Sequence, residues 1–486
     1  RLGYQFQSQT DTEVIAHLVH AYVTEGMRLF HAVQRAVREL QGAYAIAVVS
    51  SREPNTVVGS RKGSPLLLGV GNGGTGHGEN FLASDTSALL QVTRYVTYLE
   101  EGDVVEIRLD GYDIVDSEGR PAQRPIVESR LSADSIELGS YSHYMQKEIF
   151  EQPESIANTL EMVTGASALS PGLFGAEAEA VFAGTRQILI LACGTSYHSG
   201  LVAKYWLESV AQVPVAVEIA SEYRYRDSVA LPGTLVITIS QSGETADTLA
   251  ALQHAKGMGL DDTLTICNVP ESALIRQSKL RFLTRAGPEI GVASTKAFTT
   301  QLTALYLFAL NLAQRLGRIG AGELSERIDE LVRLPRLVKE VLVHSEKLKA
   351  IAERISDATH VLFIGRGANY PVALEGALKL KEISYVHAEG FAAGELKHGP
   401  IALIDHGVPV VAIAPKDATY EKLLSNIEEV KARGAEVIAL TSNGDAALHD
   451  KARDVISLPK ASPYLTSILA SVPLQLLAYY VADHKG

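Results

Sequence analysis

The stretch TLVITISQSGETADTLAALQ, residues 234–253, joins an unbroken apolar run to a polar turn and then to a helical pattern. ILILACGTSYHSGLVAKYWLE, residues 188–208, has the same order, and TLTICN, residues 263–268, is a third apolar run. Apolar strands that alternate with helices are typical of a parallel sheet covered by helices on both faces. We therefore predict an α/β fold with a doubly wound parallel sheet in this part of the chain.

The same pattern occurs a second time. It recurs as HVLFIGRGANYPVALEGALKLKE, residues 360–382, and as VPVVAIAPKDATYEKLLSNI, residues 408–427, and AEVIALTSN, residues 435–443, follows as TLTICN does in the first copy. Gly194 aligns with Gly367, an offset of 367 − 194 = 173. Thr245 aligns with Thr419, an offset of 419 − 245 = 174, so the two offsets agree to one residue. This repeat predicts two duplicated α/β domains, joined by the helix-rich residues 324–355.

The front of the chain has a different pattern. Two helical patterns, residues 10–26 and 27–40, precede short strand-like runs that Gly, Pro and Asn separate. These runs lie at residues 43–51, 55–60, 65–70, 81–85, 96–100 and 103–109. They predict an α+β domain, and the polar residues 140–156 are interpreted as a connector that leads into a helix. We expect domains at residues 1–133, 134–318 and 319–486.

Composition limits the classes of function. The 486 residues carry a formal net charge of −12, which disfavours a nucleic-acid or anionic-membrane surface. The two cysteines, Cys193 and Cys267, form neither a disulfide framework nor a zinc spacing, which favours a reducing cytoplasm. We find no apolar run of about 20 residues and no signal peptide, and so expect no membrane span. The chain begins at Arg1, so we expect a fragment or a processed product.

A hydroxyl-rich turn distinguishes the first copy from the second. The first copy reads SQSGET at residues 240–245, where the second reads APKDAT, so the fold does not require these side chains. Ligands bind beyond the carboxyl ends of parallel strands, where the next helix offers free N–H groups to an anion. A phosphate site is therefore predicted at Thr195, Ser196, Ser240, Gln241, Ser242 and Thr245. The alternative is that these hydroxyls only cap helices.

Two further features have a functional and a structural interpretation. Glu375, Lys379 and Glu382 fall at i, i+4 and i+7 on one face of a predicted helix. Such a face is usually solvated, but this helix follows the strand HVLFIG and so starts at the ligand-binding edge of its sheet. His398 lies in the glycine-rich residues 387–400, either as an exposed loop residue or as part of a mobile lid.

Five motifs together resemble the glucosamine-6-phosphate synthase family, the isomerising glutamine–fructose-6-phosphate aminotransferases. These motifs are CGTS at 193–196, SQSGETADTL at 240–249, EIGVASTKAFTTQL at 289–302, EGALKLKEISY at 375–385 and GELKHGP at 394–400. The resemblance runs from about Thr10 to the last residue. It implies two sugar-isomerase (SIS) domains behind the second half of an N-terminal-nucleophile glutaminase domain. It also implies synthesis of glucosamine 6-phosphate from fructose 6-phosphate and glutamine, in a homodimer, without cofactor or metal.

The resemblance assigns roles to individual residues. The phosphate would contact Ser196, Ser240, Gln241, Ser242 and Thr245, with Thr195 beside them, and the sugar would contact Val292 and Ser294. Glu382 matches the carboxylate that transfers the proton, and His398 matches a ring-opening histidine that reaches into the partner subunit's site. Lys379 and Glu375 match charged residues of that pocket. Asp11 matches the carboxylate that holds the glutamine α-amino group; its structural alternative is an N-cap.

The sequence departs from the family pattern at both ends. Arg1 stands where the family has its nucleophilic cysteine, and the chain stops before the family's lysine-bearing tail, which Lys485 does not match. We therefore expect the chain as written neither to hydrolyse glutamine nor to form the family's Schiff base. A phosphosugar sensor without catalysis and a simple phosphosugar isomerase are the rival functions. The presence of Glu382 and His398 argues against the first, and the TDTE match at residues 10–13 against the second.

Overall fold

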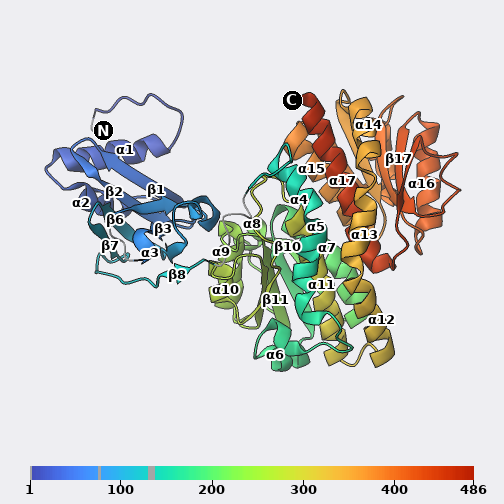
Figure 1. Cartoon of the computed structure of the whole chain (residues 1–486), viewed down its shortest axis with the longest axis horizontal. Helices are drawn as coiled ribbons and strands as arrows, with labels where there is room; N and C mark the ends of the chain where they lie inside the picture. The colour runs from blue at the N-terminus through green and yellow to red at the C-terminus, as the bar shows by residue number, and fades with distance from the viewer. Residues whose placement is uncertain (1–2, 75–77, 130–136) are drawn as a thin grey trace. The chain divides into compact units, whose positions relative to one another are not determined.

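The computed structural model in Figure 1 describes residues 3–74, 78–129 and 137–486. They fall into two compact units, Arg1–Glu137 and Leu138–Gly486. The predicted boundary between residues 133 and 134 and the first residue, Arg1, lie outside the described residues.

The first unit has two helices and two antiparallel sheets. The helices are α1 (Thr12–Thr24) and α2 (Leu29–Val37), with short turns at α3 (Gly71–Gly74) and η1 (Thr86–Leu89). One sheet has the order β1-β2-β6-β7, from β1 (Tyr44–Ser50), β2 (Glu53–Lys62), β6 (Val104–Arg108) and β7 (Gly111–Val115). The other has the order β4-β3-β5-β8, from β3 (Leu67–Val70), β4 (Asn80–Ala83), β5 (Tyr95–Tyr98) and β8 (Val127–Glu128). All six predicted strands are confirmed, and β7 and β8 are additional.

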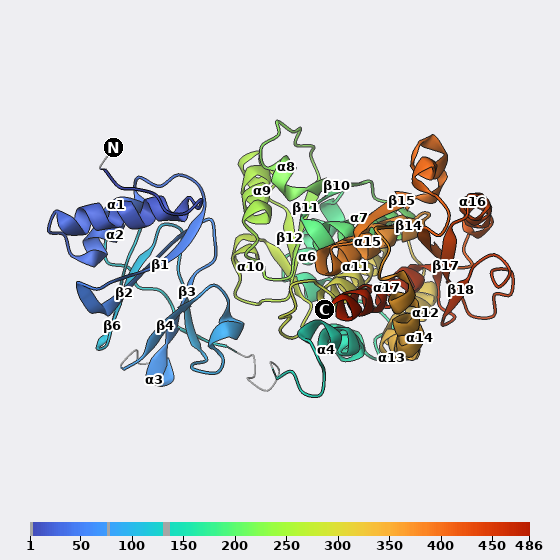
Figure 2. The ribbon, with the colours of Figure 1, turned by 90° about the horizontal axis from the view of Figure 1, so that it is seen from above.

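Side-chain alternation along the strands builds the layers of this unit. Val58 and Val104 pack with the apolar faces of α1 and α2. Their neighbours Val57 and Val105 point to the opposite face, toward Leu68 of the second sheet. α1 and α2 accordingly lie together on one side of the β1–β2–β6–β7 sheet (Figure 2). The α+β prediction is confirmed, as a helix layer over two sheets.

The second unit contains two parallel sheets of identical topology. The first has the order β10-β9-β11-β12-β13 and the second β15-β14-β16-β17-β18. Every strand pair in both sheets is parallel. In each copy the second strand along the chain, β10 or β15, lies at the edge beside the first, β9 or β14. The third strand, β11 or β16, lies on the other side of the first, which is a doubly wound order. The predicted duplication of an α/β domain is confirmed.

The elements of the second unit follow the repeat. The first copy contains β9 (Gln187–Ala192), α7 (Gly194–Trp206), η5 (Leu207–Ala211), β10 (Val215–Ile219), α8 (Ala220–Tyr223), β11 (Thr234–Ser240), α9 (Ala246–Gly257), β12 (Thr263–Cys267), α10 (Ala273–Gln277), β13 (Leu280–Leu283) and α11 (Lys296–Arg315). α12 (Ala321–Val332), α13 (Leu334–Leu342) and α14 (Ser345–Ile355) join the copies. The second copy contains β14 (His360–Gly365), α15 (Asn369–Ser384), β15 (His387–Ala392), η6 (Ala393–His398), η7 (Pro400–Leu403), β16 (Pro409–Ala414), α16 (Tyr420–Ala432), β17 (Glu436–Ser442), β18 (Asp454–Leu458) and α17 (Pro463–Lys485).

The three central strands of each sheet were predicted and the outer ones were not. All residues of β11 are buried, which gives its unbroken apolar run. β15 is an edge strand, and its polar and glycine residues were interpreted as part of a loop; this was wrong for residues 387–392. Gly390 is needed there because a Cβ would lie 2.7 Å from the backbone nitrogen of Leu374 in α15. At this close approach β15 carries a glycine in place of a side chain that would indicate a strand in sequence.

The residues predicted to be a connector form part of the packed unit. Residues 140–156 contribute α4 (Tyr144–Phe150) and the start of α5 (Gln152–Leu160). The short 3-10 helices η3 (Glu161–Val163) and η4 (Pro171–Phe174) and the α-helix α6 (Ala178–Gly184) follow. Glu148 of α4 is 2% exposed despite its charge. The stretch is polar in sequence because its buried carboxylate and hydroxyl groups, on Glu148 and Ser155, bond to the segment before α11.

One apolar core joins the two copies. α11 and α17, the last helices of each copy, are buried on all sides, and α17 packs along α14 and α15 (Figure 1). Within the described residues, α17 is a helix long and apolar enough to cross a membrane, which corrects the expectation that no run reaches this length. However, 94% of its apolar window is buried in the fold, which is typical of a core helix.

Candidate active site

The hydroxyl-rich turns lie where two neighbouring strands end. β9 and β11 pair in parallel, so their carboxyl ends meet at one edge of the sheet. Thr195 and Ser196 occupy the first turn of α7, whereas residues 240–245 connect β11 to α9. The hydroxyl of Thr248 in α9 lies 4.0 Å from the sulfur of Cys193, which links the two turns. The fold therefore brings the predicted hydroxyl groups to one edge of the first sheet.

Hydrogen bonds and one glycine fix the shape of the turn after β11. Ser240 Oγ accepts the N–H of Gly243 at 2.9 Å and lies 3.1 Å from Thr245 Oγ1. Ser242 Oγ accepts the N–H of Glu244 at 3.2 Å. Gly243 has φ +67°, and a Cβ there would lie 2.1 Å from Ser272 Oγ, so the turn requires glycine.

The N-terminus of α9 is open to an anion. Thr245 is the N-cap of this helix, yet within the described structure its side chain makes no hydrogen bond to the first turn. The alternative interpretation as a plain helix cap is therefore wrong for Thr245. Uncapped N–H groups at the positive end of a helix dipole favour a negatively charged ligand. Gln241 and Ser242 stay partly exposed beside them.

The second copy carries a carboxylate at the equivalent place. Asp417 Oδ1 accepts both the N–H and the hydroxyl of Thr419 at 2.7 Å. Asn369 Nδ2 donates to Asp417 Oδ2 at 3.3 Å. Asp417 thus places a negative charge beside the start of α16, where it would repel a phosphate. The turn of the second copy therefore presents a carboxylate where the first copy presents hydroxyl groups.

Three charged side chains of α15 form a cluster that is largely buried. The Lys379 and Glu375 side chains are 1% and 2% exposed and that of Glu382 is 35% exposed. Lys379 Nζ lies 2.5 Å from Glu382 Oε2 and 3.5 Å from Glu375 Oε1. It also donates to Thr195 Oγ1 at 3.0 Å, and Thr195 donates to Glu375 Oε1 at 3.0 Å. The interpretation of this face as a solvated surface is therefore wrong.

The two copies meet at this cluster. α7 and α15 are equivalent helices of the repeat, and they pack against each other. The first residue of α15, Asn369, is instead bonded to Asp417 and to Ser467. The prediction that α15 contributes through its start at a sheet edge was therefore wrong. Its second and third turns reach the start of α7, at the ligand edge of the other copy.

His198 belongs to the cluster and was not predicted. Its Nδ1 lies 2.8 Å from Glu375 Oε2, and its side chain is 14% exposed. His198 follows Thr195 by three residues on α7, so both face the same side of the helix. That spacing was a usable signal once Thr195 had been singled out.

The loop before α11 carries the predicted sugar contacts. Ser294 Oγ donates to Glu289 Oε2 at 2.9 Å, and the Val292 side chain is 97% exposed. Gln301 of α11 donates from Nε2 to Ser196 Oγ at 3.0 Å, which ties α11 to the turn after β9. Gln301 was a further residue missing from the sequence prediction.

His398 and Asp11 lie apart from this cluster. His398 is exposed at the end of η6, and no bond among the described residues joins it to Lys379 or Glu382. Asp11 is the exposed N-cap of α1 in the first unit, where its side chain makes no capping bond within the described residues. Glu13 instead accepts the N–H groups of Gln7 and Ser8 at 2.8 and 2.7 Å. The simple N-cap interpretation of Asp11 is therefore wrong for its side chain.

Neither cysteine is poised for nucleophilic attack. Both are free thiols, and burial raises the pKa of Cys267 to about 11 and raises that of Cys193. Across residues 3–74, 78–129 and 137–486, no group of three or more His, Cys, Asp or Glu side chains could hold a metal ion. The cytoplasmic location expected from the cysteines stays a prediction.

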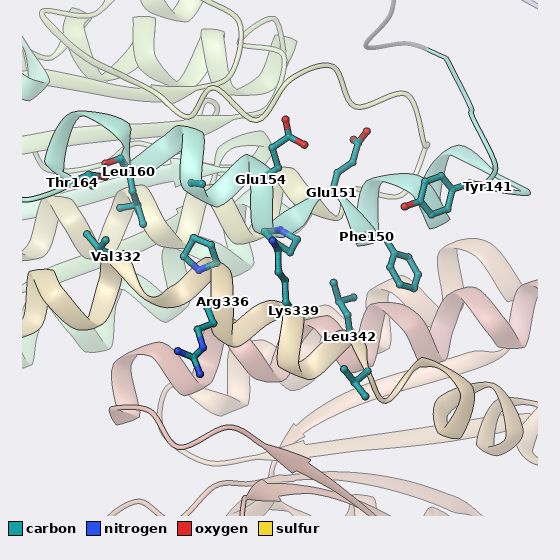
Figure 3. Close-up of a pocket in the computed structure, with 14 residues that line it drawn as sticks. Tyr141, Phe150, Glu151, Glu154, Leu160, Thr164, Val332, Arg336, Lys339 and Leu342 are labelled. Atoms are coloured by element: carbon teal, nitrogen blue, oxygen red, sulfur yellow. Dashed lines mark hydrogen bonds between the residues drawn. The ribbon is translucent and has the colours of Figure 1, made fainter.

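A groove of about 1140 Å³ lies elsewhere in the second unit, between α4–α5 and α13. Glu151 and Glu154 lie on one side of it, and Arg336 and Lys339 on the other (Figure 3). The predicted sugar-site residues are not among those that line it. The chemistry at the sheet edge and at the α7–α15 crossing is therefore separate from this groove.

Comparison with known protein families matches both parts of the chain. A SIS domain model matches residues 182–311 and 354–484, and a glutamine amidotransferase domain model matches residues 1–91. The glutamine–fructose-6-phosphate aminotransferase [isomerizing] of Bordetella parapertussis is 54% identical over 486 residues, covering 100% of this chain and 78% of that protein. The chain belongs to the isomerising glutamine–fructose-6-phosphate aminotransferase family. The Pseudomonas putida member is 51% identical over 485 residues.

Solved structures agree with this family. The C-terminal domain of the Francisella tularensis glucosamine-fructose-6-phosphate aminotransferase is 46% identical, with a TM-score of 0.69, over 71% of this chain and 98% of that one. The tagatose-6-phosphate ketose/aldose isomerase of Escherichia coli is 18% identical with a TM-score of 0.58, over 71% and 94% of the two chains. At that identity the isomerase shows only the shared SIS fold, which confirms the predicted fold class.

Proposed function

We propose that the second unit binds fructose 6-phosphate and carries out the isomerisation half of glucosamine 6-phosphate synthesis, with glutamine bound by the first unit. The observation that carries the proposal is the cluster in which Lys379 contacts Glu382, Glu375 and Thr195 at the edge that presents the hydroxyl-rich turns. The rival functions, a phosphosugar sensor and a simple isomerase, are not favoured by the names of the relatives that match the whole chain.

The phosphate would occupy the open N-terminus of α9. Hydroxyl donors would come from Ser240, Ser242 and Thr245, supported by Gln241, Thr195 and Ser196 around the same edge. Since no lysine lies within residues 240–245, the helix dipole and neutral donors would carry the binding. The backbone at Val292 and the hydroxyl of Ser294 would contact the sugar.

Glu382 would move the proton between C1 and C2. Among the three cluster side chains of α15 it is the most exposed, so a bound sugar could reach it. Its contact with the Lys379 ammonium fixes the carboxylate in place. Thr195 and His198 hold Glu375, so the buried half of the cluster stays rigid behind Glu382. General base catalysis needs such a fixed group within hydrogen-bond reach of the proton.

His398 would act in the active site of a second copy of the chain. It is exposed at the end of η6 and is separate from the Glu382 cluster of its own chain. A homodimer in which this histidine opens the sugar ring of the partner's substrate reconciles its exposure with a role in the reaction. In the first unit, the carboxylate of Asp11 is exposed and makes no capping bond to α1 within the described residues, and it would bind the α-amino group of glutamine.

Calorimetry of fructose 6-phosphate binding to Ser242→Ala tests the phosphate site. Losing one hydrogen bond to a charged group costs about 1.5–3 kcal/mol, so affinity should fall roughly 10-fold to 150-fold. Ser209→Ala is the control, because Ser209 lies in η5 and its hydroxyl bonds only to the Trp206 carbonyl among the described contacts. If Ser242→Ala bound the sugar phosphate as tightly as the control, the assignment of this turn would be wrong.

A further inference from the structure

A buried carboxylate of α4 lies under the loop that carries the proposed sugar contacts. Glu148 is 2% exposed, and its Oε1 accepts the N–H of Ile290 at 2.5 Å and that of Gly291 at 3.1 Å. Its Oε2 lies 3.3 Å from the same Gly291 nitrogen. A Cβ at Gly291 would lie 2.6 Å from this oxygen, so the loop backbone is pressed directly against the carboxylate.

A second carboxylate holds the other end of the loop. Glu289 Oε1 accepts the N–H groups of Thr295 and Ala297 at 2.8 and 3.1 Å. Its Oε2 accepts the hydroxyl of Ser294 at 2.9 Å. Glu289 therefore caps the start of α11, while Glu148 fixes the loop just before Val292. Between the two anchors, Val292 is turned out to solvent.

The helix after α4 restrains the segment that leads into this loop. In α5, Ser155 donates its hydroxyl to the carbonyl of Ala286 at 3.0 Å, and Thr159 donates to that of Thr284 at 2.5 Å. Residues 284–291 are thus bonded to α4–α5 at successive positions. Glu148 is the charged member of this series, and it is nearest the exposed tip of the loop.

We propose that Glu148 is a positioning residue for sugar binding, whose carboxylate holds the backbone of residues 289–295 in the conformation that receives the substrate. This inference rests on the proposed function, because the loop is a sugar contact only if that function holds. Without Glu148, the N–H groups of Ile290 and Gly291 would lose their acceptor, and the loop would leave this conformation to bond to water. The apparent affinity for the sugar phosphate would then fall in proportion to the fraction of molecules whose loop still has this conformation.

Two charged groups act on Glu148, Glu289 before α11 and Lys296 in α11. Other charged groups of the elements packed here are paired with one another: Lys147 of α4 with Glu151, and His143 before α4 with Asp483 of α17. Lys296 is paired with Glu151 at 2.7 Å, and its attraction lowers the pKa of Glu148 less than burial raises it. Burial, together with repulsion from Glu289, raises the pKa of Glu148 to about 7. The carboxylate that the loop uses therefore changes charge near neutral pH.

This raised pKa separates positioning from plain stability. A carboxyl group whose folded pKa is raised from 4.5 to about 7 stabilises the fold below its unfolded pKa, and this contribution is lost as the pH rises toward 7. Glu148→Gln, which removes the buried charge but keeps an acceptor, should at pH 8 unfold at the same temperature as the unchanged protein or higher. Its affinity for fructose 6-phosphate should nevertheless fall about 5-fold, because a neutral acceptor bonds the loop more weakly.

The experiment measures fructose 6-phosphate binding by calorimetry at pH 6 and pH 8, with thermal unfolding of each variant. Glu148→Met, which removes both acceptors, should bind about 10-fold or more weakly at pH 8. Glu154→Gln is the matched control, because Glu154 is exposed on α5 and should change neither quantity. The ratio of dissociation constants between Glu148→Gln and the unchanged protein should approach 1 at pH 6, where both lack the charge. This ratio cancels the titration of the sugar phosphate itself.

Two outcomes would overturn the inference. In the first, both Glu148 variants bind fructose 6-phosphate as tightly as the unchanged protein. In the second, Glu148→Gln loses the same affinity at pH 6 and pH 8, and this loss is accompanied by a lower unfolding temperature. If Glu148→Met does not fold, the Glu148→Gln ratio decides alone. Ser242→Ala separates the two proposals. Unchanged binding in Ser242→Ala with weakened binding in Glu148→Met would refute the phosphate site and leave the positioning role standing.

Discussion

Replacing Lys379 with methionine should destabilise the second unit by leaving a carboxylate buried without its cation. Lys379 and Glu375 are 1% and 2% exposed, and their charged atoms lie 3.5 Å apart. Removing one partner of a buried ion pair costs about 3–5 kcal/mol. Glu375 would keep its hydrogen bonds with Thr195 at 3.0 Å and His198 at 2.8 Å. We therefore expect the free energy of unfolding to fall by about 3 kcal/mol, the lower end of this range.

The contact with Glu382 should add little to this loss. Its side chain is 35% exposed, so water screens the pair even though its 2.5 Å distance is the shorter one. For a unit of this size, a loss of 3 kcal/mol should lower the unfolding midpoint on the order of 5 °C. Lys381→Met, an exposed position on the same helix, should leave the midpoint within about 1 °C.

The assay is thermal unfolding followed by circular dichroism, on Lys379→Met alone and combined with Glu375→Gln. The second change removes the orphaned charge, so the double variant should regain most of the lost stability. A single variant as stable as Lys381→Met would refute the reasoning. So would a double variant that is less stable than the single one, because the cost would then come from lost packing and not from an unpaired charge.

Three other predictions concern the reaction and the first unit. In the full-length enzyme, Glu382→Gln should lose on the order of 10²–10⁴-fold in proton transfer while it still binds sugar phosphate. Mixing Glu382→Gln with His398→Ala subunits should restore part of the activity, and no recovery in demonstrated mixed dimers would refute a shared site. Hydrogen bonds from Ser8 and Gln7 lower the pKa of Glu13 to about 2, so its stabilisation of the first unit is complete above its unfolded pKa near 4.5. It should disappear as the pH falls toward 2, a loss that Glu13→Gln should not show in an acid titration followed by circular dichroism.

The sequence by itself determined the elements that are buried on both sides. Residues 234–240 have no polar face to satisfy, so their apolar run predicts a central parallel strand directly. The offset of about 173 residues predicted two domains of one topology because each copy repeats the same order of strands and helices. Edge strands such as β15 were not predicted, because one side of an edge strand faces solvent and tolerates polar residues and glycine.

The predicted phosphate turn also came from local sequence, since its hydroxyls and glycine lie within residues 240–245. The charged cluster did not. Periodicity placed Glu375, Lys379 and Glu382 on one face of a helix, but periodicity alone does not say whether that face meets water or protein. Only the packing of α15 on α7 buried it and brought in His198, which is 177 residues away from Glu375 in the chain.

Glu148 is a second charged residue whose burial the sequence alone did not predict. Its polar surroundings in sequence predicted a connector that leads into a helix, and burial of its carboxylate was not predicted, because a carboxylate is rarely buried unless other groups satisfy it. The groups that satisfy it are N–H groups of Ile290 and Gly291, more than 140 residues later in the chain. Backbone donors leave no trace in side-chain patterns. A buried charge held by distant backbone is therefore decided by the tertiary structure alone.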